Sequence, residues 1–324
     1  MQDPQTILNP DLWRLRDAFR AQGFDLRLVG GCVRDLLMDL TPKDVDLHTD
    51  ATPEECVAVY NEAGVRFEPT GLQHGTISVI FDHVAYEITS LRTDVETDGR
   101  HATVAYTRDW LVDLERRDFT MNAMSMSFEG ELLDPFNGLA DLREGVVTFV
   151  GDPEKRIRED YLRILRWFRF RGRFGNQDNQ ADCDAVQNLC KGLEQISRER
   201  VWSEVKQILS RPSGPAQLKD MHDMYIAVHV DLPAWIYDIT EATQLAAQQA
   251  NAITIMVSLY GSKTLPVLLK WKASGDEHAL AEFLCKNQDE NPFRCMAVQG
   301  VSRAWARELA LLQNRDAFEL AVLD

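Results

Sequence analysis

Hydrophobic and polar positions alternate in two different ways along the chain. Before about residue 150, short apolar runs stand between turn residues, which predicts strands mixed with short helices. From Asp152 onward, apolar residues recur with helical spacing and β-branched runs are few. The pattern therefore predicts an α+β chain, with a small mixed-sheet head over 1–150 followed by an all-helical remainder.

The helical remainder has one clear interruption. The run Arg211-Pro212-Ser213-Gly214-Pro215 combines residues that end helices. We expect it to separate a helical neck over 151–212 from a helical body and tail over 213–324. No internal repeat or low-complexity tract accompanies this division.

The first candidate site is a glycine turn. The apolar run Leu26–Val29 predicts a strand that ends at Gly30 and Gly31, and the residues from Cys32 to Leu40 predict a short helix. Backbone N–H groups in such a turn can hold phosphate oxygens, and Arg34 would add a positive fork. Strand–glycine–helix turns are common, so this motif alone leaves a plain turn as the alternative.

A pair of acids follows. Val45 and Leu47 alternate with Asp44, Asp46 and His48, which is typical of a half-buried strand and would place the two Asp side chains on one face. Adjacent carboxylates in that arrangement suit Mg²⁺, and metal-dependent phosphoryl chemistry needs such a pair. A solvated acidic turn is the alternative.

A third acid lies on a predicted hairpin. The β-rich runs Thr76–Phe81 and Val84–Leu91 are separated by Asp82-His83. Alternation puts Glu87 on the less apolar face of the second strand. Beside Asp44 and Asp46, Glu87 would be a third metal ligand; otherwise it is an exposed acid.

The segment from Glu115 to Ala123 is rich in polar side chains before an apolar run. Arg116 and Arg117 can contact phosphates, Asp118 can orient an arginine, and Asn122 can reach a sugar hydroxyl. The alternative is a helix N-terminus with Asp118 near its cap. The segment by itself leaves both open.

Charge along the chain is uneven. The formal net charge is −16, which by itself argues against a polyanionic partner. Between Glu154 and Phe174, however, eight Lys or Arg face three acids, a local charge of +5. A polyanionic ligand would therefore be drawn to this one region.

Within that basic region, a helical reading places Asp160 and Arg163 on one face, with Glu159 four residues before Arg163. Arg166 and Arg169 continue the line. An acid and an arginine side by side can pair with the edge of a nucleotide base. The alternative is an intrahelical salt bridge on a surface helix.

The order of these motifs is more specific than any one of them. The runs VGGCVRDLLMDLTPKDVDL, EITSLR, RRDFTMNA, EDYLRILRWFRF and ISRERVWSEVKQIL occur in this order, over roughly residues 26–210. Together they resemble the class II tRNA nucleotidyltransferase family, which includes CCA-adding enzymes and bacterial poly(A) polymerases.

The resemblance implies a role for each motif. Asp44 and Asp46 would hold catalytic Mg²⁺, with Glu87 as the additional carboxylate. Gly30, Gly31 and Arg34 would hold the triphosphate of CTP or ATP. The sugar and phosphates would meet Arg116, Arg117, Asp118 and Asn122. Base selection would fall on Glu159, Asp160 and Arg163, with Arg166 as a further nucleotide-binding residue. The 3′ end of tRNA would then receive C, C and A.

Two further segments bear on the choice within the family. Thr97–Val104 looks like the flexible loop needed to add the terminal A, with Ala102 where the family often has Pro. The chain ends acidic from Glu319 to Asp324, without the basic extension common in bacterial poly(A) polymerases. The loop favours full CCA addition or A addition alone, and the acidic end favours a tRNA substrate. We expect CCA addition to tRNA; A-only addition, poly(A) synthesis and a non-catalytic tRNA-binding protein are the alternatives.

Cellular location is read from three absences. No stretch approaches the roughly 18 uninterrupted apolar residues of a membrane helix. The first residues have neither the basic start nor the apolar core of a signal peptide. The six cysteines are scattered without a CxxC pair, which favours reduced thiols. We therefore expect a cytoplasmic protein with no membrane partner.

Overall fold

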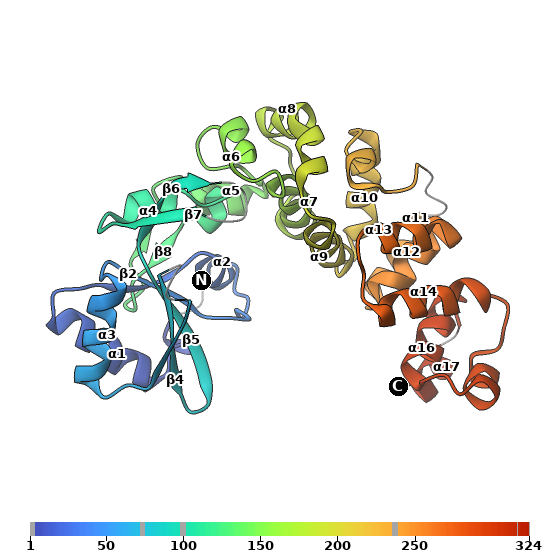
Figure 1. Ribbon diagram of the computed structural model, residues 1–324, viewed down its shortest axis with the longest axis horizontal. Helices are drawn as coiled ribbons and strands as arrows, with labels where there is room; N and C mark the ends of the chain where they lie inside the picture. The colour runs from blue at the N-terminus through green and yellow to red at the C-terminus, as the bar shows by residue number, and fades with distance from the viewer. Residues whose placement is uncertain (1–3, 72–74, 98–101, 235–238, 316, 324) are drawn as a thin grey trace. The chain divides into compact units, whose positions relative to one another are not determined.

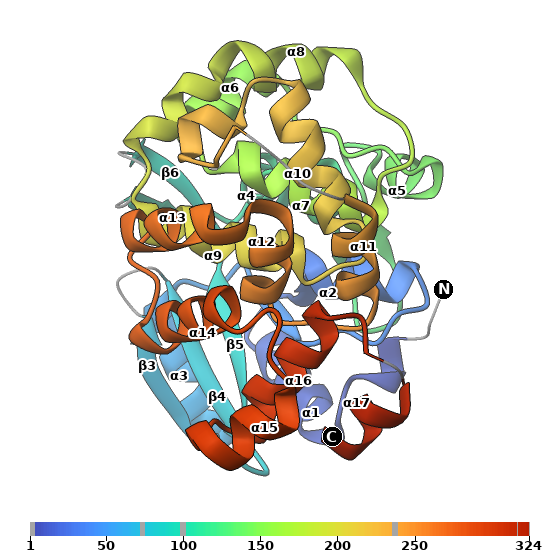
Figure 2. The same cartoon turned by 90° about the vertical axis from the view of Figure 1, so that its right-hand side faces the viewer.

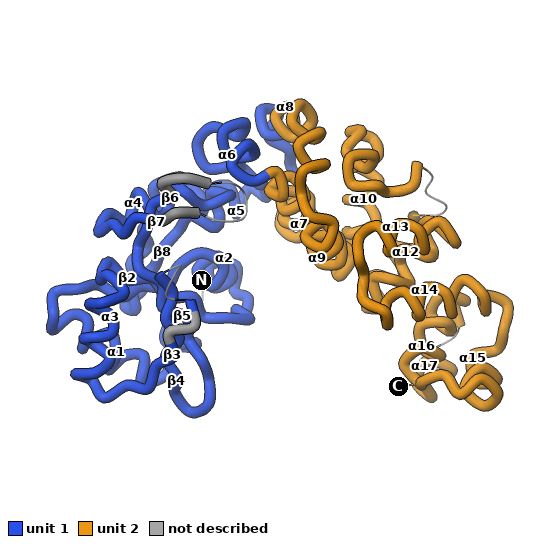
Figure 3. Tube along the Cα trace, viewed as in Figure 1, with its two compact units in different colours: residues 1–160, 176–182 blue, residues 161–175, 183–324 orange. Residues whose placement is uncertain are grey.

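The computed structural model describes residues 4–71, 75–97, 102–234, 239–315 and 317–323. It divides into two compact units (Figure 3): Met1–Asp160 with Asn176–Asp182, and Tyr161–Gly175 with Cys183–Asp324. The first unit therefore extends beyond the head boundary predicted at residue 150, as far as Asp160, and also includes Asn176–Asp182. The further division at residue 212 stays a prediction.

The first unit is built on a mixed seven-stranded sheet in the order β3-β4-β5-β2-β1-β8-β9 (Figure 1). Only the β2–β5 pair is parallel; its neighbours are antiparallel. A separate two-stranded sheet pairs β6 with β7. The strands are β1 Leu26–Val29, β2 Asp46–Thr49, β3 Phe67–Gly71, β4 Thr76–Phe81, β5 Val84–Ser90, β6 Arg92–Thr97, β7 Ala102–Tyr106, β8 Ser125–Met126 and β9 Leu132–Leu133.

Helices complete the first unit, and α1 and α3 lie together on one side of the sheet (Figures 1 and 2). Helix α3 begins with a capping box: Glu55 N–H donates to Thr52 Oγ1, and Thr52 N–H donates to Glu55 Oε2. The helices are η1 Pro4–Thr6, α1 Pro10–Ala21, α2 Gly31–Leu37, α3 Pro53–Ala63, α4 Trp110–Glu115, η3 Thr120–Asn122, α5 Gly138–Glu144 and α6 Pro153–Glu159.

The second unit is helical throughout its described part. Trp271 is fully buried, stacks on Trp202 and donates its indole N–H to the Val230 carbonyl at 2.8 Å. The elements are α7 Arg163–Phe174, α8 Gln180–Leu189 (which begins in the first unit), η4 Cys190–Gln195, α9 Arg198–Leu209, α10 Gly214–Asp223, η5 Ala227–Val230, α11 Ile239–Ala247, α12 Ala252–Tyr260, η6 Gly261–Lys263, α13 Thr264–Lys270, α14 Gly275–Lys286, α15 Pro292–Arg294, the π-turn η7 Cys295–Gln299, α16 Arg303–Leu312 and α17 Ala317–Leu323. The α+β expectation is therefore confirmed.

One stretch of the second unit, Ala252–Lys270, has the length and apolar composition of a membrane span. It is divided at Gly261 into α12, η6 and α13. More than half of it is buried inside the protein, including Ile255, Met256 and Leu259. The stretch therefore forms part of the helical core.

Candidate active site

The glycine turn lies where β1 leaves the sheet. Gly30 has φ +69° and ψ −122°, a conformation that only glycine adopts readily. A Cβ added to Gly30 would lie 2.7 Å from Nη1 of Arg117, so the missing side chain also makes room for that guanidinium. A Cβ on Gly31 would meet its nearest atom, on Arg34, at 3.6 Å. The two glycines therefore serve different purposes.

Two of the three predicted acids lie opposite each other on neighbouring strands. Asp46 on β2 and Glu87 on β5 are register partners in the parallel pair, as His48 and Thr89 are two residues further on. Alternation had placed Glu87 and Thr89 on one face, and this register brings that face beside Asp46.

Asp44 approaches this pair from outside the sheet. We expected Asp44 and Val45 to belong to the strand, and this is wrong: β2 begins at Asp46, and Asp44 lies in a bend. The physical reason is that β1, which pairs with β2 at Leu28–Leu47, turns away at Gly30 and offers Val45 no partner.

The electrostatics of Asp46 reflect this gathering. Partial burial raises the pKa of Asp46; Arg117 lowers it, and the charges of Glu87 and Asp44 raise it again. Like-charged carboxylates with one cationic neighbour fit a site that a divalent cation would neutralise. Among the described residues, no three His, Cys, Asp or Glu side chains already converge on one point, so these carboxylates would have to turn toward a shared ion.

Arg34 and Asn122 belong to one buried chain of hydrogen bonds. Arg34 is 5% exposed; its Nε and Nη2 donate to Asp35 Oδ1, and its Nη1 donates to Asn122 Oδ1 at 2.6 Å. Asn122 Nδ2 in turn donates to Asp118 Oδ1 at 3.0 Å. Arg34 of α2 is therefore hydrogen-bonded to Asn122 of η3, and Asp118 accepts a hydrogen bond from the amide nitrogen of the same Asn122.

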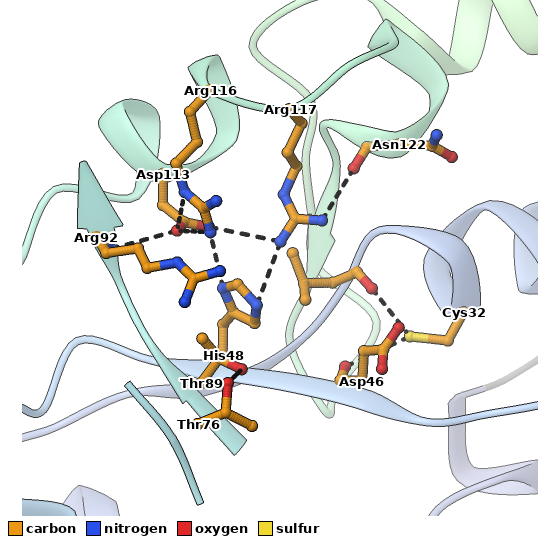
Figure 4. A network of polar contacts seen from close by, with 11 residues as sticks. Cys32, Asp46, His48, Thr76, Thr89, Arg92, Asp113, Arg116, Arg117 and Asn122 are labelled. Atoms are coloured by element: carbon orange, nitrogen blue, oxygen red, sulfur yellow. Dashed lines mark hydrogen bonds and ion pairs between the residues drawn. The ribbon is translucent and has the colours of Figure 1, made fainter. Parts of the chain in front are cut away.

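The arginine pair follows a helix and does not start one. Helix α4 ends at Glu115 with Arg116 as its C-cap. The 3-10 helix η3 then begins at Thr120 with Phe119 as its N-cap, so Asp118 lies next to a helix start, as the alternative expected. Nε and Nη2 of Arg116 both donate to Oδ1 of Asp113, which is completely buried. The reversal after α4 turns Arg117 toward the sheet (Figure 4).

The structure adds two residues that the sequence reasoning did not select, His48 and Asp113. His48 Nδ1 lies 3.0 Å from Asp113 Oδ2, and its Nε2 lies 3.3 Å from Arg117 Nη2 (Figure 4). His48 had been given only a place in the strand pattern. Its partners come from residues 65 and 69 positions away, a distance that periodicity does not bridge.

The pKa values of this trio are shifted. Burial lowers the pKa of His48 to about 4, against the opposing charge of Asp113. Burial would raise the pKa of Asp113, but contact with His48 and the two arginines holds it well below its usual range. His48 is therefore neutral and Asp113 charged at neutral pH.

The proposed base-reading residues do not share a helix. Asp160 is the C-cap of α6 in extended backbone, with φ −156° and ψ 104°, and α7 begins at Arg163. The expected single helical face for Asp160 and Arg163 is therefore wrong. Arg163 and Arg166 both lie on α7, and Glu159 pairs with Arg156 at 2.9 Å.

Acids from other helices oppose the arginine stripe of α7. Arg166 and Arg169 lie 3.9 and 3.4 Å from the carboxylate of Glu204 on α9. Arg171 pairs with Asp220 on α10. These arginines of α7 thus pair with acids of other helices, whereas on α6 Arg158 pairs with Glu154 within the helix. Of the loop predicted over Thr97–Val104, residues 98–101 lie outside the described residues.

Comparisons with known proteins show the family of this chain. The family model described as "Poly A polymerase head domain" matches residues 26–148. The chain is 39% identical over 303 residues to mouse "CCA tRNA nucleotidyltransferase 1, mitochondrial", covering 90% of this chain and 69% of the relative. It is 40% identical over 212 residues to the "CCA-adding enzyme" of Leuconostoc mesenteroides, covering 64% of this chain and 51% of that protein.

Solved structures show the same fold. The Bacillus stearothermophilus CCA-adding enzyme in complex with CTP matches with a TM-score of 0.78 and 24% identity, covering 98% of this chain and 82% of that one. A tRNA nucleotidyltransferase complexed with a primer tRNA and an incoming ATP analog matches with a TM-score of 0.71 and 19% identity, covering 95% and 96%. With its motifs in order and its relatives matched over most of their length, the chain belongs to the family of CCA-adding tRNA nucleotidyltransferases that carry the poly(A) polymerase head domain.

Proposed function

We propose that this chain adds C, C and then A, from CTP and ATP, to the 3′ end of tRNA without a nucleic-acid template. The observation that carries this proposal is the meeting of the Gly30 turn, the Asp46–Glu87 pair and Arg117 in one corner of the head. The mouse relative, named a CCA tRNA nucleotidyltransferase, supports the choice of tRNA.

In each cycle the tRNA 3′-hydroxyl attacks the α-phosphate of the bound nucleotide. The hydroxyl loses its proton to solvent and its oxygen bonds to the α-phosphorus. The bond from the α-phosphorus to the oxygen that bridges to the β-phosphate breaks, and pyrophosphate leaves. The family depends on a divalent metal, and we propose Mg²⁺ held by Asp44 and Asp46, with Glu87 as a further ligand. Bound there, Mg²⁺ would supply activation of the hydroxyl and charge neutralisation of the leaving pyrophosphate.

The chain's own residues bind and orient the nucleotide. The backbone of Gly30 and Gly31 at the start of α2 and the guanidinium of Arg117 face the triphosphate. Arg34 and Asp118 hold Asn122, which is placed for the sugar, and Arg116 is held by Asp113. In this role Arg34 supports the sugar contact through Asn122.

Base choice is assigned to Asp160, Arg163 and Arg166. A carboxylate acceptor and guanidinium donors can pair with the edges of C and A, while G and U would leave buried polar groups unpaired. For Asp160 and Arg163 this assignment follows the family motif, and Arg166 is added as the next arginine on α7. We also propose a cytoplasmic location, although three of the relatives are named mitochondrial.

The decisive experiment incubates the protein with tRNA lacking CCA, Mg²⁺ and labelled CTP or ATP. We expect two C and one A per tRNA. Asp44→Ala and Asp46→Ala should each lower the rate by at least about 100-fold, because phosphoryl charge is no longer neutralised. Glu87→Gln should lower it too if Glu87 is a ligand. The control is Asp82→Asn, an exposed carboxylate at the β4–β5 turn whose φ of 47° suits Asn.

Other outcomes identify the alternatives. Many A residues on generic RNA with CTP refused would establish poly(A) synthesis, and A addition only to tRNA ending in CC would establish an A-adding enzyme. Binding of tRNA without any incorporation, equally in wild type and Asp44→Ala, would establish a non-catalytic binder and overturn the proposal.

A further inference from the structure

His48 stands at the centre of the site without belonging to any motif assigned above. It lies on β2, two residues after Asp46, and its side chain is 8% exposed. Asp113 of α4 lies on one side of the imidazole and Arg117 on the other (Figure 4). One ring therefore joins the sheet that carries the carboxylates to the segment that carries the phosphate-facing arginine.

The hydrogen-bond partners fix which ring nitrogen carries the proton. A guanidinium can only donate, so Nη2 of Arg117 donates and Nε2 of His48 accepts. Nδ1 must then carry the proton and donate it to Oδ2 of Asp113. The arrangement has a direction: Asp113 orients the imidazole, and the imidazole presents one acceptor to Arg117.

Arg117 has few other attachments. Its Nη1 lies 3.5 Å from the Asn122 carbonyl, and its Nη2 lies 3.5 Å from Asp113 Oδ2. Its Nε has no hydrogen-bond partner among the described residues. All of these contacts are long, so donors remain for a further ligand, and the His48 contact is the shortest that the guanidinium makes with a described side chain.

The position of Arg117 matters at short range. A Cβ added to Gly30 would lie only 2.7 Å from Nη1 of Arg117, and the positive charge of Arg117 lowers the pKa of Asp46. A shift of the guanidinium away from His48 would move it against the turn or toward the carboxylates.

We propose that His48 is a positioning residue for the triphosphate, holding the Arg117 guanidinium between the Gly30 turn and the carboxylates with Asp113 behind it. This inference rests on the proposed nucleotide site. It assigns His48 to phosphate binding through Arg117, and not to base selection. Its loss should therefore affect CTP and ATP equally.

The test uses two variants of the full-length protein that divide the two hydrogen bonds of His48. His48→Asn keeps a donor near Asp113 and loses the acceptor that faces Arg117. His48→Gln places an amide oxygen near the former Nε2 and loses the donor to Asp113. Binding of CTP and of ATP is measured by calorimetry without tRNA, and KM and kcat are measured in the incorporation assay.

We expect His48→Asn to weaken CTP and ATP binding and raise both KM values by the same factor, about 3- to 10-fold, as for one lost hydrogen bond. The value of kcat should change less, and His48→Gln should bind more tightly than His48→Asn. In an Arg117→Ala background, His48→Asn should have no further effect.

Two results would overturn the inference. One is a purely structural role: both His48 variants lower the melting temperature alike, with nucleotide affinity unchanged in the folded protein. The other is an unequal effect on CTP and ATP, which would assign His48 to base selection. Failure of the wild-type protein to bind either nucleotide would instead count against the proposed function itself.

Discussion

Gly30 and Gly31 are neighbours in the sequence with different physical constraints. Gly30 needs both its positive φ and its empty side, because the Arg117 guanidinium fills the space of a Cβ. Gly31 is the first residue of α2, and its nearest contact would be an ordinary one. The sequence motif treats the two alike, whereas the structure separates them.

This difference predicts unequal effects of the same substitution. Gly30→Ala should destabilise the protein by about 1–3 kcal/mol from backbone strain, and it should displace Arg117 and weaken nucleotide binding. Gly31→Ala should cost less than about 1 kcal/mol, since helix position and space both allow alanine. Thermal unfolding and calorimetric CTP binding measure both; equal losses in the two variants would contradict the assignment.

Single residues also show what a sequence can reveal. Glu87 was predicted from strand alternation, because a period of two fixes which face a side chain takes. His48 obeys the same alternation yet is buried, because Asp113 and Arg117 cover that part of the face. Burial of a polar residue by a distant segment leaves no local pattern.

Among the elements, the junction of α6 and α7 departs most from expectation. Continuous helical periodicity predicted one helix, but the backbone is extended at Asp160 and α7 begins three residues later, at Arg163. In the second unit, Tyr161 packs against Gly192 so closely that a Cβ there would lie 2.0 Å from the ring. This contact joins residues that lie too far apart in the sequence for a local helical pattern to include.

The first turn of α8 holds a buried acid with a titration of its own. Asp182 is 2% exposed, and its Oδ2 has no hydrogen-bond partner among the described residues. Burial raises the pKa of Asp182 to about 7; the Phe149 N–H lowers it and the nearby charge of Asp141 raises it. The folded protein therefore keeps a proton on Asp182 that the unfolded chain releases near the ordinary aspartate pKa of 3.8.

That difference makes the free energy of unfolding fall as pH rises. The contribution of the Asp182 proton to this free energy is complete below the unfolded pKa and is lost as pH rises through about 7. The total loss is up to about 4 kcal/mol. Asp182→Asn should flatten the decrease in unfolding free energy between pH 5 and 8, measured by denaturant melts. Asp184→Asn removes an exposed carboxylate from the same helix and should keep the wild-type slope; a wild-type slope in Asp182→Asn would refute this account.

At the scale of the whole molecule, one region carries a local charge opposite in sign to the net charge of the chain. The chain carries −16, and much of its one basic region is tied to acids such as Glu159, Glu204 and Asp220. The local charge of +5 counted only the acids between Glu154 and Phe174, whereas Glu204 and Asp220 come from later helices. We therefore expect few cationic contacts with tRNA, and a modest dependence of tRNA affinity on salt.

Two ion pairs allow this to be measured. Arg158 on α6 pairs with Glu154 at 3.0 Å, and Lys286 on α14 pairs with Glu282 at 3.2 Å, both four residues apart and both exposed. If the basic region binds tRNA, Arg158→Gln should weaken tRNA binding. It should also make the negative slope of log affinity against log salt shallower by about 0.7–0.9. Lys286→Gln should leave both unchanged, and equal effects of the two would exclude the basic region as the tRNA site.

The sequence by itself determined the α+β class, the strand that ends at the Gly30 turn and the family. It also determined that Asp46 and Glu87 lie on strands. These depend on local periodicity, glycine conformation and motif order, which a linear chain carries. Only the tertiary structure decided that Asp44 precedes the strand, that the helix breaks at Asp160, and that His48 and Asp113 join Arg117. Those outcomes depend on pairing and burial between segments far apart in the chain, where the contacts made on folding outweigh local preference.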